Sequence, residues 1–198
     1  MENRTVSTVR QASRPSRPIE ASRTRGFSLL ELIMTMSVAA ILLTIAIPSF
    51  RYVTNSNRVA SEVNGLLGDL QFARAEAIKE GKNITVCPST DQVTCSKSVD
   101  WETGWIVFAD SNPPGYAVPA GTTALRIQTK FSSSDTFQAT NDLIWVIFNR
   151  NGYAQGVAAG TTLIELQTNP VTNAWTRCLT ISFTGAVATE LQGTGNCT

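Results

Sequence analysis

The sequence predicts an α+β protein, in which a long N-terminal helix precedes a C-terminal head of antiparallel β-strands. An uncharged apolar run from Leu32 to Ile47 is followed by apolar residues at helical spacing as far as Ala77. After Gly81 the pattern changes to short β-rich runs separated by turn residues. The 198 residues are 42% hydrophobic, which is enough to form one globular core beside such a helix.

The first 26 residues differ in composition from the rest of the chain. They contain six arginines against two glutamates, many Ser and Thr residues and two prolines, without an apolar period. This composition predicts a basic, disordered segment, and the positive-inside rule places it on the cytoplasmic side of a membrane. We therefore interpret residues 1–26 as a targeting leader.

The segment that follows is long enough to cross a membrane. Phe27 to Ile47 has 21 residues, close to the roughly 20 that span hydrocarbon. A secretory signal peptide is the alternative, but Ala46-Ile47-Pro48-Ser49 is a poor cleavage site for one. Glu31 lies in this segment, where a carboxylate costs about 2.5–3.5 kcal/mol at the centre of a span and less near its end. Such a cost usually marks a function, with a positive charge of the same assembly as partner.

The helix is predicted to continue past the membrane to Glu80. The apolar positions beyond the span recur in alternating steps of four and three residues, and charged residues lie mostly off this stripe. Gly81 follows, where a helix C-cap is typical. We expect 27–50 to be a transmembrane or filament-core helix and 51–80 an amphipathic extension that forms one wall of the head. The stripe consists of Val59, Val63, Leu66, Leu70, Ala73 and Ala77.

Residues 81–198 are predicted to form a periplasmic, β-rich head. Turn sequences such as Asn151-Gly152 and Asn169-Pro170 separate the candidate strands. Because helices do not alternate with these strands, we expect antiparallel sheets, one of them packed on the helix. The predicted strands are Ile84–Cys87, Trp105–Ala109, Ala124–Phe131, Leu143–Asn149, Leu163–Thr168, Cys178–Thr184 and Ala186–Leu191.

Four cysteines, Cys87, Cys95, Cys178 and Cys197, lie beyond the span, which suits an oxidising compartment. Four cysteines allow three pairings. We favour the local pairs, Cys87 with Cys95 and Cys178 with Cys197, because each would close an otherwise loose segment. The spacings are not those of metal sites, and without histidine a zinc ion would need all four thiolates. We expect no metal and no cofactor.

An enzymatic function is not supported. The chain has no histidine, which removes the commonest general base, and it contains no Gly-x-Ser-x-Gly motif or P-loop. Asp100 and Glu102 form the nearest approach to an acid–base pair, but we interpret them as a solvated turn before a strand. The tryptophans of the head are interpreted as core or sheet packing rather than a ligand surface. They are Trp101, Trp105, Trp145 and Trp175.

The segment Arg25-Gly26-Phe27-Ser28-Leu29-Leu30-Glu31-Leu32 resembles the processing site of type IV prepilins and pseudopilins. This resemblance implies that a prepilin peptidase cleaves after Gly26 and methylates the new terminus at Phe27. It implies that the Glu31 carboxylate guides docking onto a neighbouring subunit. It also implies a single-pass inner-membrane protein with a periplasmic head, which an inner-membrane assembly platform transfers into a pilus or pseudopilus fibre.

Three segments of the head are similar to the H-type (GspH-like) group of minor pilins and pseudopilins: Trp105–Asp110, Phe148–Tyr153 and Cys178–Gly185. The resemblance implies a type IV pilin-like fold with a β-sandwich-like head on the helix. The implied function is that of a minor type IV pilin that helps to initiate or tip the pilus, together with other minor and major pilins. A type II secretion pseudopilin is the alternative.

A pilus-associated DNA-binding subunit for natural transformation is a further alternative. The branch of the group with that function carries a Gly-Arg-x-Arg motif, and the matching Gly185-Ala186-Val187-Ala188 lacks both arginines. Beyond Gly81 the chain has six basic against eight acidic residues, whereas phosphate binding needs clustered cations. DNA binding is therefore disfavoured, with Arg126, Lys130 and Arg150 as weak candidates.

Overall fold

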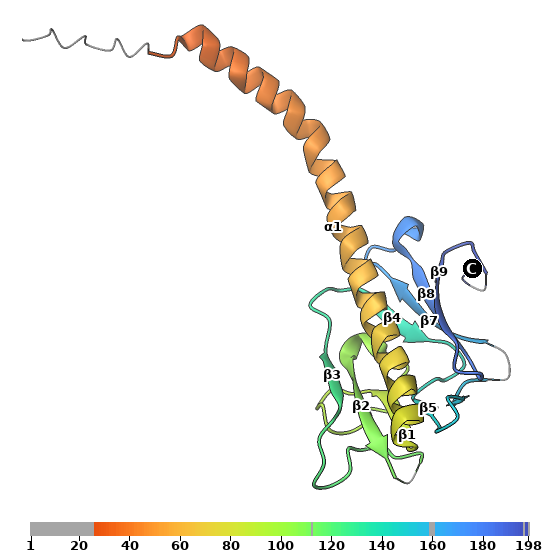
Figure 1. Ribbon diagram of the computed structural model, residues 1–198. Coiled ribbons are helices and arrows are strands. Elements are labelled where there is room, and N and C mark those ends of the chain that lie inside the picture. Colours follow the sequence, from red (N-terminus) through yellow and green to blue (C-terminus); the bar gives the residue numbers. More distant parts are fainter. Residues whose placement is uncertain (1–25, 112, 159–160, 196, 198) are drawn as a thin grey trace, which may run out of the picture. The chain divides into compact units, whose positions relative to one another are not determined.

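The computed structural model describes residues 26–111, 113–158, 161–195 and 197 (Figure 1). The chain divides into two compact units, Met1–Ile45 and Ala46–Thr198, and helix α1 (Leu29–Glu80) belongs to both. The described part of the head contains nine strands in two sheets. The structure thus confirms the predicted α+β class.

Helix α1 begins two residues after the predicted start and ends at the predicted residue, Glu80. The six positions of the predicted stripe are all buried, from Val59 to Ala77, so the helical period identified the face that packs on the head. Gly81 ends the helix with a φ of 65°, a conformation that glycine adopts without steric cost. Pro48 lies inside the helix and has no N–H to donate to the carbonyl of Thr44.

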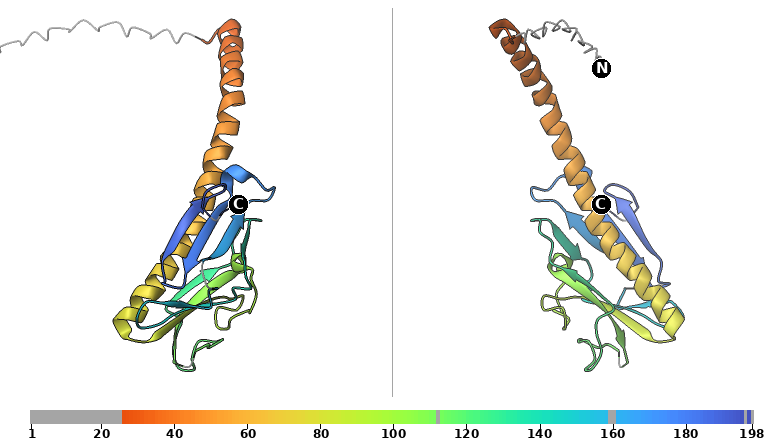
Figure 2. Two further views of the ribbon diagram at one scale, coloured as in Figure 1. Left: turned by 90° about the vertical axis from the view of Figure 1, so that its right-hand side faces the viewer. Right: turned by 60° about the vertical axis from the view of Figure 1, so that its left-hand side comes forward.

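Two antiparallel sheets form the head (Figure 2). The strand order is β3-β2-β1-β5-β6 in one sheet and β4-β7-β8-β9 in the other. The strands are β1 (Asn83–Pro88), β2 (Gly104–Asp110), β3 (Arg126–Thr129), β4 (Thr136–Ala139), β5 (Val146–Phe148), β6 (Ala154–Gln155), β7 (Thr161–Gln167), β8 (Arg177–Ser182) and β9 (Val187–Leu191). Two short 3₁₀ turns, η1 (Trp101–Thr103) and η2 (Asn173–Trp175), complete the described elements.

All seven predicted strands are present, but β4 and β6 were not predicted. β4 follows a Ser-rich run that has the composition of a loop, and its one fully buried side chain is that of Phe137. β6 has two residues and pairs only with β5. β3 and β5 are shorter than predicted, and Phe131 and Leu143 lie outside them although both side chains are buried.

One core is shared by the buried stripe of α1 and the inner faces of both sheets. Trp105 packs edge-on against Phe131 with ring centroids 5.9 Å apart, and Phe131 stacks on Phe137 at 6.0 Å. Alternate residues of β2 point to opposite faces, so Ile106 and Phe108 belong to a second cluster with a disulfide. The strand is therefore buried on both faces.

Asp69 of α1 is buried, although it is not one of the six apolar positions of the predicted stripe. Its carboxylate accepts the indole N–H of Trp105 at 2.8 Å and a guanidinium N–H of Arg126 at 3.0 Å. The guanidinium of Arg126 also lies over the ring of Phe72, 4.1 Å from its centroid. Asp69 thus fastens the helix to β2 and β3.

A second polar contact holds α1 to the loop before β4. Arg58 donates two hydrogen bonds, of 2.9 and 3.0 Å, to the Asp135 carboxylate, whose side chain is 1% exposed. Ser133 donates to Oε1 of Glu62 at 2.9 Å, while Oε2 of Glu62 is buried without a partner in the described part of the chain. Burial raises the pKa of Glu62, and the negative charge of the nearby Asp135 raises it further. The hydrogen bond from Ser133 and the positive charge of Arg58 lower this pKa, but burial outweighs them.

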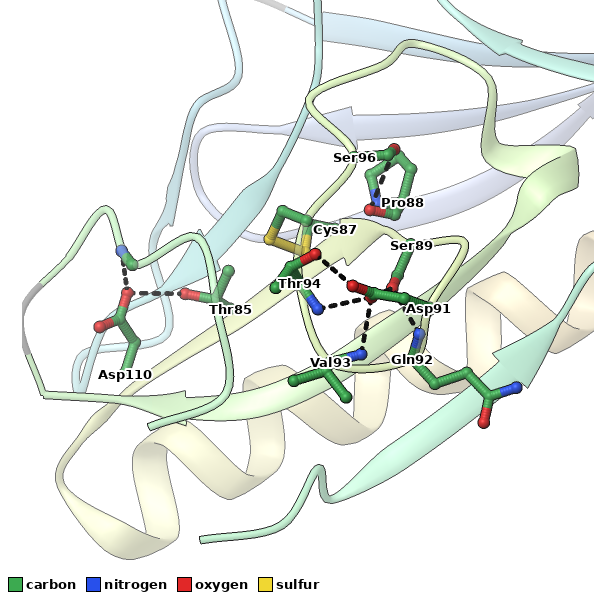
Figure 3. The surroundings of a disulfide bond; sticks show 12 residues. Thr85, Cys87, Pro88, Ser89, Asp91, Gln92, Val93, Thr94, Ser96 and Asp110 are labelled. Atoms are coloured by element: carbon green, nitrogen blue, oxygen red, sulfur yellow. Dashed lines mark hydrogen bonds between the residues drawn. A yellow bond between two sulfur atoms is a disulfide. The ribbon is translucent and has the colours of Figure 1, made fainter. Parts of the chain in front are cut away.

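The disulfides join Cys87 to Cys95 and Cys178 to Cys197, the two local pairings favoured from the sequence. The first closes a loop that is ordered by the Asp91 carboxylate (Figure 3). This carboxylate accepts hydrogen bonds from Thr94 Oγ1 and from the backbone N–H groups of Val93 and Thr94, which hold the pKa of Asp91 well below its usual value. The loop therefore covers the outer side of β2 as a rigid element.

The turn between β8 and β9 packs closely on the turn between β5 and β6. Gly185 has a φ of 78°, and a Cβ there would collide with the carbonyl oxygen of Gly152. Arg74 of α1 donates to the carbonyl of Thr184 at 3.1 Å, which keeps the same turn against the helix. This junction admits only glycine at position 185.

We expect Gly185→Ala to destabilise the head more than Gly193→Ala. Gly193 has the same φ of 78° but open space around it, so its substitution reports only the backbone strain, about 1–2 kcal/mol. The collision at Gly185 should add about 1–3 kcal/mol. Urea unfolding of the two variants in detergent measures the difference, and equal losses of stability would contradict the predicted collision.

We expect Glu62→Gln to stabilise the head near neutral pH. Because the pKa of Glu62 is raised on folding, the wild-type head loses stability as the pH rises from 4.5, the ordinary value, through the folded pKa. The amide cannot ionise and keeps the acceptor for Ser133, so the difference should vanish below pH 4.5. Urea unfolding over this pH range tests the prediction, with the exposed Glu80→Gln as control. A difference that does not depend on pH would contradict it.

Candidate functional site

The start of α1 is built from Ser28 to Leu32. The backbone N–H of Glu31 donates to Oγ of Ser28 at 3.2 Å, and that of Leu32 to the Ser28 carbonyl at 3.1 Å. Ser28 is therefore the N-cap, in the Ser-x-x-Glu pattern of a capping box. This signal is present in the sequence but was not used there. It places Glu31 in the first turn, where the helix dipole favours a negative charge.

The apolar surface of the first half of α1 is exposed in the part of the chain that the structure describes. Every large apolar side chain from Phe27 to Ile47 is at least half exposed, between 50% for Leu32 and 77% for Leu29. The helix contains an 18-residue window of mean hydropathy 2.3, so by length and composition it qualifies to span a membrane. Apolar surface of this extent requires lipid or other protein as a cover.

The polar groups within this apolar segment are largely satisfied by the helix itself. The hydroxyls of Thr35, Ser37 and Thr44 donate to carbonyls three or four residues earlier, at 2.6–2.9 Å. Glu31 is the one ionisable side chain between Gly26 and Phe50. Its carboxylate accepts no hydrogen bond from the described residues, so it is available to a donor on another molecule.

The predicted cleavage position lies immediately before the helix. Gly26 and Phe27 are exposed and precede the first helical residue, Leu29. The remainder of the predicted leader, residues 1–25, lies outside the described residues. A peptide bond in this position is open to a peptidase, and removal of the leader would create an amino group four residues before Glu31.

The weak DNA-binding candidates do not form one patch. Arg126 in β3 is engaged by Asp69 and Phe72, as described above. Lys130 follows β3, whereas Arg150 follows β5, and the strand order places β2 and β1 between them. The fold thus separates cations that a nucleic-acid backbone would need close together.

The turn with the paired carboxylates is structural, which corrects its interpretation as a solvated turn. Trp101 is fully buried and its indole N–H donates to the Leu143 carbonyl at 3.2 Å. Glu102 accepts the backbone N–H of Phe137 at 3.0 Å, and Asp100 accepts the side-chain amide of Gln138 at 2.9 Å. Both carboxylates therefore fasten β4 to η1. The described residues contain no group of acidic or cysteine side chains that could hold a metal ion.

Comparison with known proteins supports the interpretation of both parts of the chain. The prokaryotic N-terminal methylation motif matches residues 21–47, and a family model described as type II transport protein GspH matches residues 62–185. No curated protein matches. The methylation motif implies processing by a prepilin peptidase, and a pilin-type family implies assembly with other pilins. An apolar N-terminal helix in such a family is consistent with the inner membrane and the pilus.

Two crystal structures of the type IV minor pilin FimU from Pseudomonas aeruginosa (strain PAO1) are similar to this structure. In space group P21, FimU is 22% identical, with a TM-score of 0.50, over 71% of this chain and 92% of that chain. In space group P65 it is also 22% identical, with a TM-score of 0.47, over 67% of this chain and 90% of that chain. At this identity the similarity concerns the fold.

The GspH model covers more than half of the chain. This family consists of structural subunits, not enzymes. The chain therefore belongs to the GspH family, as a minor pilin or pseudopilin of a type IV pilus or a type II secretion system.

Proposed function

We propose that this chain is a minor type IV pilin that helps to initiate or tip the pilus after its leader is removed. The observation that carries the proposal is the exposed apolar half of α1, in which Glu31 is the one ionisable side chain. The proposed parts are the cleaved leader 1–26, the membrane or fibre-core helix 27–50, the amphipathic extension 51–80 and the periplasmic head 81–198.

The apolar half of α1 has two successive surroundings in this proposal. Before assembly it lies in the inner membrane. Its hydroxyls and backbone groups form hydrogen bonds within the helix, so few unpaired polar groups face lipid. Cleavage after Gly26 then exposes the amino group of Phe27, which the same peptidase methylates. In the fibre, helices of neighbouring subunits replace the lipid.

Glu31 sets the axial position that the subunit takes in the fibre. A carboxylate in apolar surroundings is costly unless it meets a positive charge, and the amino group of Phe27 on a neighbouring subunit supplies one. Because an unpaired buried charge is strongly unfavourable, axial positions that leave Glu31 without its partner are disfavoured. The Ser28 cap supports this role because it keeps Glu31 in the first helical turn.

A type II secretion pseudopilin is the second candidate function, because the family model that matches the head is that of a type II transport protein. The similarity of the fold to a type IV minor pilin is the reason to examine pili first. DNA binding stays disfavoured, since Arg126 is occupied by Asp69 and the head has more acidic than basic residues.

In a strain that lacks this gene, we expect surface pili to be lost and to return when the wild-type chain is supplied. Glu31→Ala should leave pili at the level of the deletion strain, although the chain is still processed and present by immunoblot. Glu80→Ala, which removes an exposed carboxylate at the other end of α1, should restore them. Pili are counted by electron microscopy.

Normal pili in the deletion strain would contradict the initiating role. A loss of exported proteins from that strain, with normal pili, would favour the secretion pseudopilin. Full restoration of pili by Glu31→Ala would contradict the proposed docking role of the carboxylate.

A further inference from the structure

A loop of the head folds back onto α1 at the end of the apolar segment. Tyr52 of α1 packs against Trp175 of η2, with ring centroids 5.8 Å apart and an angle of 50° between the rings. Both residues belong to the unit Ala46–Thr198. Figures 1 and 2 show η2 beside α1 at the end of the head where the helix enters it. Tyr52 comes two residues after Phe50, the last residue of the proposed membrane helix.

Large apolar and aromatic side chains at this end of the head are exposed. Phe50 is 73% exposed, Tyr52 55% and Val53 51% on the helix, and Val171 is 61% exposed on the loop before η2. The loop therefore presents an apolar side chain to its surroundings close in sequence to Trp175. Arg51 is exposed beside Tyr52, and Arg177 follows the loop directly.

The indole N–H of Trp175 has no acceptor among the described residues, although it is buried. By contrast, the indole N–H groups of Trp101 and Trp105 donate to Leu143 and Asp69. A buried donor without an acceptor costs about 1–3 kcal/mol. Packing between loop and helix accounts for the ring contact and for the burial of this donor, but it does not account for the exposed Val171.

These features match the chemistry of a membrane–water interface. Tyr and Trp concentrate at the headgroup level, because they combine an apolar ring with a polar edge. Here Tyr52, which is 55% exposed, carries the polar edge, because the indole N–H of Trp175 is buried. The exposed Arg51 beside Tyr52 can extend its side chain to lipid phosphates, whereas Arg177 donates to the carbonyls of Ala174 and Thr176 within the loop. The position of Tyr52 along the chain agrees with such an interface, because the hydrocarbon layer ends where the apolar segment 27–50 ends.

We propose that the loop 169–176, together with Tyr52, is an interfacial anchor that rests on the headgroup layer of a phospholipid bilayer before assembly. The inference rests on the proposed function in one respect, namely that residues 27–50 cross the membrane. The anchor restrains the head against the bilayer surface, with Val171 and Trp175 at the acyl boundary. Entry into a fibre removes the subunit from lipid and releases it.

The test uses the tryptophan fluorescence of the full chain in phosphatidylcholine vesicles whose headgroups carry a nitroxide quencher. We expect quenching in the wild-type chain and its loss in Trp175→Phe. Trp145→Phe is the matched control, since Trp145 packs on the disulfide cluster of the other sheet, and it should keep the wild-type quenching. Equal quenching in the Trp175→Phe variant and the wild type would overturn the proposal.

A second pair of variants separates docking from mere proximity to the membrane. Val171→Asp should reduce the quenching of Trp175, because a carboxylate opposes entry into the acyl boundary. Val93→Asp, at a comparably exposed valine in the disulfide loop, should not. Both positions are exposed, so neither change should unfold the head. Undiminished quenching in Val171→Asp would contradict anchoring.

Flotation of the same vesicles on a density gradient distinguishes the two possible failures. A chain that floats with the vesicles but shows no quenching of Trp175 would overturn the anchor and leave the proposed function intact. A chain that does not float would contradict the membrane helix, and the anchor with it. A chain that floats, with quenching that depends on Trp175 and Val171, supports both.

Discussion

The first half of α1 carries an apolar surface that is exposed among the described residues, and the structure depends on how that surface is covered. The large apolar side chains from Phe27 to Ile47 are at least half exposed, and the hydroxyls of Thr35, Ser37 and Thr44 donate to carbonyls of the helix. Water is an unfavourable surrounding for so much apolar area. A bilayer and a bundle of similar helices can both cover this apolar surface. One segment can therefore serve in a membrane and in a fibre.

The second half of the same helix has the opposite arrangement, because its apolar stripe is fully buried by the head. Two polar contacts fix how the head sits on this part of the helix. Asp69 joins α1 to Trp105 and Arg126, and Arg58 joins it to Asp135. Both aspartates are buried whereas the arginines are partly exposed, so loss of either arginine leaves a buried carboxylate without its charged partner. These contacts therefore specify one orientation of head and helix within this unit.

Features that depend on neighbouring residues were predictable from the sequence. The buried stripe, the helix end at Glu80 and seven of the nine described strands follow from periodicity and turn chemistry. The roles of Gly26, Phe27 and Glu31 also rest on a local motif and stay predictions, to which the structure adds the position of Glu31 in the first helical turn. Even there, the Ser28 cap was overlooked, although its spacing to Glu31 is visible in the sequence.

Features that depend on distant residues were not predictable. Asp69 is buried because its partners, 36 and 57 residues later, arrive from β2 and β3, and a helical period cannot anticipate them. β4 depends on pairing with β7 and on the contacts of Asp100 and Glu102. The separation of Arg126 from Arg150 follows from strand order, which composition does not determine.

We propose that this chain is a processed subunit whose N-terminal helix passes from lipid to protein. The mass of the N-terminal peptide, from the chain purified from its own cells, tests this most directly. We expect the chain to begin at Phe27 with a methyl group on its amino nitrogen. A mature chain that still begins in the leader, or that begins after Ala46 as a cleaved signal peptide would leave it, would rule out prepilin processing.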